Sequence, residues 1–292
     1  MAEQPLAALQ ANRRSRKGND ALSGQAASFV GSIPQHYDRG MGPVIFADFA
    51  DDIARRVAAF VPMRVLEIAA GTGIVTRRLR DTLPAAAELT ATDLNSPMLD
   101  VARTKFAPDE QVEYRSADAT SLPFPNGAFD AVVCQFGVMF FPDKERSYRE
   151  VHRVLSSGGH YVFNVWDAHR HNPFGRLVHE TIGGFFAADP PQFYQVPYGY
   201  HRIDPVKDSL TNAGFTDLRI AVIRLECQIP DARAFALGLI YGNPVIIDQI
   251  QTRGGVDPDR IVDALTEALR REFGPDPGCL PLQAIVFEAR RD

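Results

Sequence analysis

The chain has 292 residues, of which 45% are hydrophobic, so it can form one large α/β domain with insertions or two small domains. A formal net charge of −5 provides no basic field for a polyanion, which argues against nucleic acid and an anionic membrane as main partners. The three cysteines are far apart and form no C-x-x-C pair. We therefore expect no metal site, no disulfide framework and a cytoplasmic location. Apolar runs stay short of the about 20 residues that cross a bilayer, so no membrane span is expected.

The first segment, residues 1–20, is rich in Ala, Gln, Asn and charge without a sustained hydrophobic period, which predicts a disordered tail. The remainder, residues 21–292, is predicted to be a single domain. Near its start, a segment opening at Pro43 repeats apolar residues at helical spacing, and proline suits the first turn of a helix. These apolar residues are Ile45, Phe46, Phe49, Ile53, Val57 and Phe60.

At residues 65–73 an apolar run ends in two glycines and a helix-like segment follows, which indicates a buried strand turning into a helix. Such a turn collects main-chain N–H groups at the positive end of a helix dipole, and Gly71 and Gly73 let a ligand lie against bare backbone. A dinucleotide fingerprint reads G-x-G-x-x-G. The matching positions here are Ala69, Gly71 and Ile74. Because two of the three glycines are missing, a pyrophosphate ligand is not favoured.

Glu67 precedes this turn, where a carboxylate can help hold cationic groups such as the ammonium and sulfonium of S-adenosyl-L-methionine. The run from Glu67 to Gly73 resembles the first motif of class I S-adenosyl-L-methionine-dependent methyltransferases, with Ala69 in the first glycine's place. The similarity is to the small-molecule subgroup of ubiquinone/menaquinone C-methyltransferases (methyltransferase type 11/25). Residues 122–130 resemble that subgroup's turn into the fourth strand, and the likeness covers a cofactor-binding core over residues 60–167.

The resemblance implies an α/β fold with a doubly wound, mainly parallel sheet of seven strands, the Rossmann-like methyltransferase fold. Its last strand is expected to insert antiparallel beside the fifth. N-terminal helices are expected over the cofactor mouth, and helical insertions in the C-terminal part. Periodicity itself indicates strands and helices without their order. It predicts helices over 74–82, 143–155, 205–212, from 231 onward and after Pro258, and strands over 161–165, 218–225 and 283–289.

The second strand, predicted over residues 88–92, ends at Asp93. A carboxylate at this place beside the glycine turn can accept both hydroxyls of a ribose. Dinucleotides also contain ribose, so Asp93 does not distinguish S-adenosyl-L-methionine from a dinucleotide as the ligand. Leu94 and Met98 follow and can face the adenine.

The third and fourth strands also end in polar residues. The strand over residues 112–115 leads to Asp118 and Ala119, whose carboxylate and main-chain N–H can read the adenine ring. The strand over residues 131–135 is a continuous apolar run that ends at Gln135. Ligands of open α/β sheets bind beyond the carboxyl ends of the strands, so Gln135 is expected near the methyl group and the acceptor.

The segment 168–202 is rich in Phe, Tyr and His and follows the fifth strand. With the insertion 230–256, it is predicted to form a lid over an aromatic, mostly apolar acceptor pocket. Two histidines two residues apart without a third defined ligand do not indicate a metal. A general base is needed only if the acceptor must lose a proton. The candidates for it are His36, Tyr37, His169 and His171, and the resemblance places Tyr37 near the methionine end of the cofactor.

The sequence thus predicts an enzyme that transfers the methyl group of S-adenosyl-L-methionine to a small, apolar or aromatic acceptor by direct displacement. The residues expected to bind the cofactor are Tyr37, Glu67, Ala69, Gly71, Gly73, Asp93, Leu94, Met98, Asp118, Ala119 and Gln135. Three alternatives stay open: a non-catalytic cofactor-binding or regulatory protein on the same fold, an NAD-dependent oxidoreductase, and a methyltransferase acting on protein or nucleic acid. The sequence determines neither the acceptor, nor whether O, N or C is methylated, nor whether the chain forms a homodimer.

Overall fold

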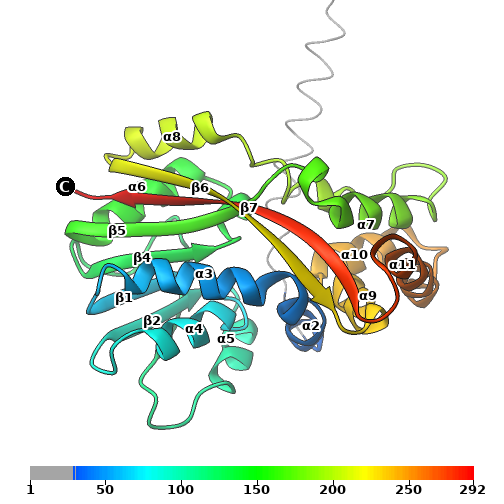
Figure 1. Cartoon of the computed structure of the whole chain (residues 1–292), viewed down its shortest axis with the longest axis horizontal. Helices are drawn as coiled ribbons and strands as arrows, with labels where there is room; N and C mark the ends of the chain where they lie inside the picture. Colours follow the sequence, from blue (N-terminus) through cyan, green and yellow to red (C-terminus); the bar gives the residue numbers. More distant parts are fainter. Residues whose placement is uncertain (1–28, 30) are drawn as a thin grey trace, which may run out of the picture.

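The computed structural model describes residue 29 and residues 31–292 (Figure 1). The tail predicted over residues 1–20 lies outside the described residues. One seven-stranded sheet, with the order β3-β2-β1-β4-β5-β7-β6, runs through the molecule. Its strands are β1 (Arg64–Ile68), β2 (Glu88–Asp93), β3 (Glu113–Ser116), β4 (Phe129–Gln135), β5 (Leu155–Trp166), β6 (Thr216–Ile229) and β7 (Gly278–Arg290).

The strand directions confirm the predicted fold class. β1 is parallel to β2 and β4, β2 to β3, and β4 to β5, whereas β7 is antiparallel to both β5 and β6. β5 begins at Leu155 rather than at the predicted residue 161, because residues 155 and 160 pair with β4 on either side of a register shift. Residues 156–159 therefore form an irregularity within the strand.

Helices cover both faces of the sheet, as buried parallel strands require. Val65 of β1 packs in one apolar cluster with α3 (Ala47–Ala58) and α4 (Ile74–Thr82). The next residue, Leu66, packs in another cluster with α6 (Lys144–Val154) and α8 (Ile203–Asn212). The helix α5 (Ser96–Arg103) follows β2. Side chains alternate between the two faces of a strand, so this short apolar run fills two separate cores.

A helical cap stands beyond one end of the sheet (Figure 1). It consists of α7 (Pro173–Gly183), α9 (Ala232–Tyr241), α10 (Pro244–Arg253) and α11 (Pro258–Phe273), with short 3-10 turns at residues 138–140, 169–171 and 193–195. β7 pairs with β5 only up to Ala284, opposite Trp166, while its pairing with β6 continues to Gly278. The two long strands therefore leave the sheet as a ribbon that leads into the cap.

The N-terminal helical region differs from its prediction. The chain is helical from α2 (Ile33–His36) through the π-helix η1 (Tyr37–Phe46) into α3. Pro43 lies inside η1 instead of opening a helix, and Pro34 is the proline in a first turn. The predicted start of the helix at Pro43 was therefore wrong, whereas its apolar period over Phe49, Ile53 and Val57 is confirmed as the buried face of α3. Within the residues described, no helix combines the length and apolar character that a bilayer crossing requires.

Candidate functional site

The glycine turn joins β1 to α4, and three of its residues are left-handed: Ala69, Gly71 and Gly73, with φ of 54°, 56° and 79°. A Cβ on Gly73 would lie 2.7 Å from Cβ of Ala102, so glycine is required there for close contact with α5. A Cβ on Gly71 would only reach van der Waals distance of Met98, at 3.6 Å from its Cε. Gly71 therefore exposes open backbone to a ligand, and Met98 beside it is buried.

Asp93 ends β2 directly beside this turn. Its carboxylate accepts hydrogen bonds from the amide of Gly71 at 2.9 Å and from the amide of Asn95 at 2.8 Å. Asp93 is 9% exposed, and burial raises the pKa of its carboxyl above the ordinary value. The next residue, Leu94, is 57% exposed. A carboxylate that can still accept hydroxyl protons therefore stands beside an uncovered apolar side chain, an arrangement suited to a nucleoside.

Glu67 lies on β1 beneath the turn. It is buried, and its Oε2 accepts a 2.6 Å hydrogen bond from the Thr76 hydroxyl of α4. Burial raises the pKa of the Glu67 carboxyl to about 8, and the nearby Asp93 carboxylate acts in the same direction. The side chain thus lies beneath the glycine turn instead of on the surface, and its burial favours the protonated form.

Asp118 and Ala119 follow β3, as predicted. The Asp118 carboxylate is exposed, and its Oδ1 accepts from both the amide and the hydroxyl of Thr120 at 2.8 Å. This turn holds the carboxylate in place while its other oxygen, Oδ2, takes part in neither of these bonds. Ala119 is half-buried against the larger apolar core.

Gln135, at the end of β4, is tied to two other elements. Its Nε2 donates to the carbonyl of Phe46 at 3.1 Å, and Asn164 of β5 donates to its Oε1 at 3.5 Å. Asn164 also accepts from the amide of Phe136 at 2.9 Å, a non-glycine residue held at φ 52°. Strained backbone of this kind is concentrated at functional sites. Sequence reasoning missed Asn164, which inside an apolar strand carries no local signal of its role.

The four candidate bases are not brought together. The Tyr37 ring stacks on Phe46 at 5.3 Å, and burial, with a smaller effect of the Asp93 carboxylate, raises the pKa of its hydroxyl. The histidines lie elsewhere. The ring of His36 contacts Tyr241 of α9, and Arg170 donates to His171. Nε2 of His169 lies 3.0 Å from the carbonyl oxygen of Tyr194, and burial lowers its pKa.

The lid segment contributes buried aromatic rings. Tyr198 of this segment is 5% exposed, and the Trp166 ring at the end of β5, which lies 6.4 Å from the Tyr198 ring, stacks on Phe136 with a centroid distance of 3.8 Å. The half-exposed rings of Phe140 and Phe193 stack on each other at 5.9 Å. Part of the predicted aromatic lid therefore belongs to the core, and only its outer rings are available to an acceptor.

A buried polar network fixes the ribbon where it leaves the sheet. Asn172 donates to the carbonyls of Asp167 and Gln283 at 2.9 and 3.0 Å and accepts from the Gln283 amide at 2.9 Å. The Gln283 side chain donates to the Asp167 carboxylate and accepts from Arg224. The bonds that Asn172 and Asp167 form with Gln283 join residues 111 and 116 positions apart, and they set the direction in which β7 enters the cap.

Comparison with known proteins agrees with this geometry. Residues 66–163 match the family described as "Methyltransferase domain". This segment of the chain is similar to a methyltransferase domain. The match confirms the family predicted from the glycine turn, and it begins within β1 and ends within β5. No group of His, Cys, Asp or Glu in the described part of the chain has an arrangement that could hold a metal ion.

The similar proteins carry methyltransferase names. A demethylmenaquinone methyltransferase of Thermus thermophilus is 44% identical over 102 residues, which are 35% of this chain and 46% of that protein. Its namesake in Deinococcus radiodurans is 33% identical over 53% of this chain and 66% of its own length. The solved structure of the YcgJ protein of Bacillus subtilis has a TM-score of 0.55 at 19% identity, covering 84% of this chain and 98% of its own. The chain thus spans between about half and two thirds of these two curated relatives.

Proposed function

We propose that this protein binds S-adenosyl-L-methionine and transfers its methyl group to a small acceptor. One observation carries the proposal: the open backbone at Gly71 donates to the buried Asp93 carboxylate, which stands beside the exposed Leu94. This arrangement offers a nucleoside its hydroxyl acceptor, its apolar platform and close approach of the main chain. It occurs within the segment that matches the methyltransferase domain.

Each part of the cleft has a role in this proposal. Asp93 accepts from the ribose hydroxyls, Leu94 and Met98 contact the adenine, and Asp118 with the Ala119 amide reads the ring edge. The left-handed turn at Ala69, Gly71 and Gly73 lets the main chain approach the methionine half, and Tyr37 and Gln135 border the same region. The bound cofactor supplies an electrophilic methyl group on a sulfonium. The protein contributes orientation and exclusion of water.

Charge distinguishes this ligand from a dinucleotide. The Asp93 carboxylate lies beside the glycine turn and accepts a hydrogen bond from the Gly71 amide. A pyrophosphate would bring two negative charges toward this carboxylate, whereas an ammonium and a sulfonium would be attracted to it. With the missing glycines, this favours S-adenosyl-L-methionine over NAD.

For the acceptor we propose a small apolar or aromatic molecule. The half-exposed, stacked rings of Phe140 and Phe193 border the lid, and the formal charge of −5 does not favour nucleic acid. The two curated relatives are named for demethylmenaquinone, so a quinol of that type is the first acceptor to test. We further propose a cytoplasmic location, and a homodimer is the oligomer to look for.

The cofactor is tested by thermal unfolding with S-adenosylmethionine, S-adenosylhomocysteine or NAD. A ligand at a hundred times its dissociation constant should stabilise the protein by about 2.7 kcal/mol. We expect this with the two adenosyl compounds, and we expect Asp93→Ala to lose it. Asp100→Ala is the matched control, because Asp100 is exposed on α5 and pairs only with Arg103 in the residues described. Stabilisation by NAD alone would reject the proposal.

Transfer is tested separately from binding. The protein is incubated with methyl-labelled S-adenosylmethionine and a panel of quinols, phenols and apolar amines, and label is counted in the organic extract. Label in one acceptor class, lost in Asp93→Ala, identifies the substrate. Binding of the cofactor without transfer to any acceptor would favour the non-catalytic alternative.

A further inference from the structure

The segment 31–46, called the strap below, packs beside the glycine turn of the proposed cofactor site. A Cβ on its Gly42 would lie 3.0 Å from Cδ1 of Ile74, the first residue of α4 after the turn, and Asp93 on the other side of the turn is only 9% exposed. The carboxylate that is proposed to receive the ribose is therefore largely buried, while Leu94 beside it is exposed. Movement of the strap away from the glycine turn would widen the access to this carboxylate.

The strap is held tightly on one side. A Cβ on Gly40 would lie 2.5 Å from Cα of Gly238 in α9, and a Cβ on Gly242 would lie 2.6 Å from the backbone nitrogen of Tyr37. Backbone therefore packs directly on backbone, without side chains that could rearrange. The strap and α9 consequently form one rigid unit.

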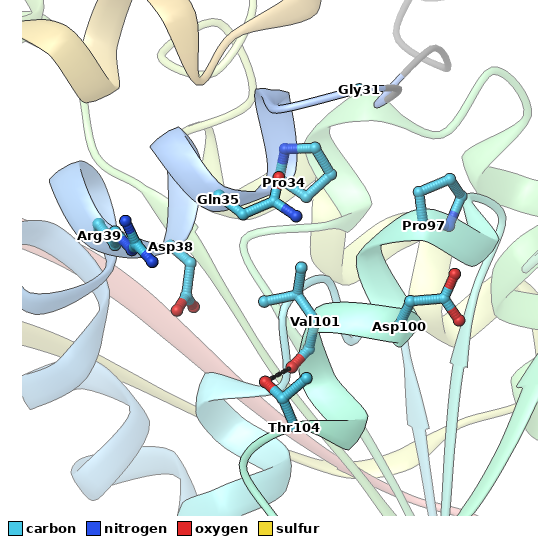
Figure 2. A pocket seen from close by; sticks show the side chains of 9 residues that line it. All are labelled: Gly31, Pro34, Gln35, Asp38, Arg39, Pro97, Asp100, Val101 and Thr104. Carbon is cyan, nitrogen blue, oxygen red and sulfur yellow. Dashed lines mark hydrogen bonds between the residues drawn. The ribbon is translucent and has the colours of Figure 1, made fainter.

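The other side of the strap faces α5 across an open hollow (Figure 2). Strap residues line one wall and α5 with the residue after it lines the other, enclosing about 480 Å³. One ion pair crosses between the two sides near this hollow, from Nζ of Lys105 to Oδ1 of Asp38. Both side chains are more than three-quarters buried, at 24% and 21% exposure, so solvent screens this pair less than the exposed pairs of the surface.

We propose that the Asp38–Lys105 ion pair is a latch that holds the strap over the cofactor cleft, and that cofactor enters and leaves when it opens along the hollow. The assignment of the ligand rests on the proposed function, whereas the latch itself rests on the geometry above. The latch acts on the free and the occupied protein alike, so breaking it should raise the rates of association and dissociation together and leave affinity nearly unchanged.

The test compares Asp38→Asn, Lys105→Met and the double variant with the wild type. Surface plasmon resonance with S-adenosylhomocysteine measures both rates. We expect each single substitution to raise both rates about fivefold, and the double variant to add nothing further, because either change removes the same pair. Arg103→Met is the matched control: it breaks an ion pair within α5 that does not reach the strap.

Amide hydrogen exchange supplies a readout that needs no ligand. The amides of residues 69–73 and 93–95 form the floor beneath the strap, and we expect them to exchange about fivefold faster in Asp38→Asn than in the wild type or Arg103→Met. Unchanged floor exchange would overturn the latch even if S-adenosylhomocysteine binds. A rise in dissociation rate alone, with an equal loss of affinity, would also overturn it. Faster floor exchange in a protein that binds no adenosyl compound would support the latch and reject the proposed function.

Discussion

Glu67→Gln replaces the buried carboxyl beneath the glycine turn by a group of nearly the same shape that cannot ionise. Its carbonyl oxygen can still accept the hydrogen bond that Thr76 donates to Oε2. The only large change is therefore the loss of titration. Burial raises the pKa of the Glu67 carboxyl from 4.5 to about 8, so titration of this single side chain should appear in the stability of the protein.

The sign follows from proton binding. Because the folded pKa lies above the unfolded value, the folded protein holds the proton more tightly between pH 4.5 and 8. Stability from this group is therefore complete below pH 4.5 and is lost as pH rises toward 8. Each pH unit within that window is worth about 1.4 kcal/mol. From pH 5.5 to 7.5, the free energy of unfolding of the wild type should fall by about 2.7 kcal/mol relative to Glu67→Gln.

This difference is measured by urea unfolding of both proteins at pH 5.5, 6.5 and 7.5, with circular dichroism as the signal. The contributions of titrating groups that both proteins share cancel in the difference. Glu113→Gln, at an exposed position on β3, is the control for replacing a carboxyl group by an amide. A difference between wild type and Glu67→Gln that stays constant over the three pH values would refute the reasoning, since Glu67 would then ionise normally in the folded protein.

Other predictions concern positions where backbone or buried polar groups are constrained. Ala69→Gly relieves a left-handed alanine and should raise the free energy of unfolding by about 0.5–1 kcal/mol in denaturant melts. Gly137→Ala would place a Cβ 2.6 Å from that of Ala69 and should lower the free energy of unfolding by about 1–3 kcal/mol. Adding Ala69→Gly to this variant should recover part of the loss. If the effects of the two substitutions simply add, the two side chains do not clash. Asn172→Ala leaves the main-chain groups that it bonds at Asp167 and Gln283 unsatisfied and should cost about 2–4 kcal/mol by the same measurement. A loss below about 0.5 kcal/mol would show that water replaces the amide. Gly238→Ala should separate α9 from Gly40 and speed amide exchange over residues 33–46, and unchanged protection there would argue against backbone packing at this crossing.

Local patterns in the sequence were sufficient for the core of the fold. β1 and α4 are predicted at the residues where the structure has them, because an apolar run, two glycines and a helical period lie within twenty consecutive positions. Asp93 could be placed beside Gly71 because parallel neighbouring strands bring their carboxyl ends to one edge. The antiparallel β7 followed from the family resemblance, since periodicity does not encode strand order.

The tertiary structure decided which elements pack against each of these local segments. Glu67 reads as a surface ligand in the sequence, yet α4 folds over it and Thr76 bonds it beneath the floor. The helical course of the strap could not be predicted, because a proline such as Pro43 locally indicates the start of a helix. The packing of the strap on α9 is what places this proline inside a helix.

The sequence by itself therefore determined the strands, the turn and the acidic residues at the strand ends, since these depend on neighbours a few positions away. Only the tertiary structure decided which of those groups are buried, which helix covers the cleft, and that Asp38 meets Lys105. The physical reason is that burial and ion pairing between distant segments depend on how whole elements pack. The sequence around Asp38 would look the same with or without its partner, which lies 67 residues away in the chain.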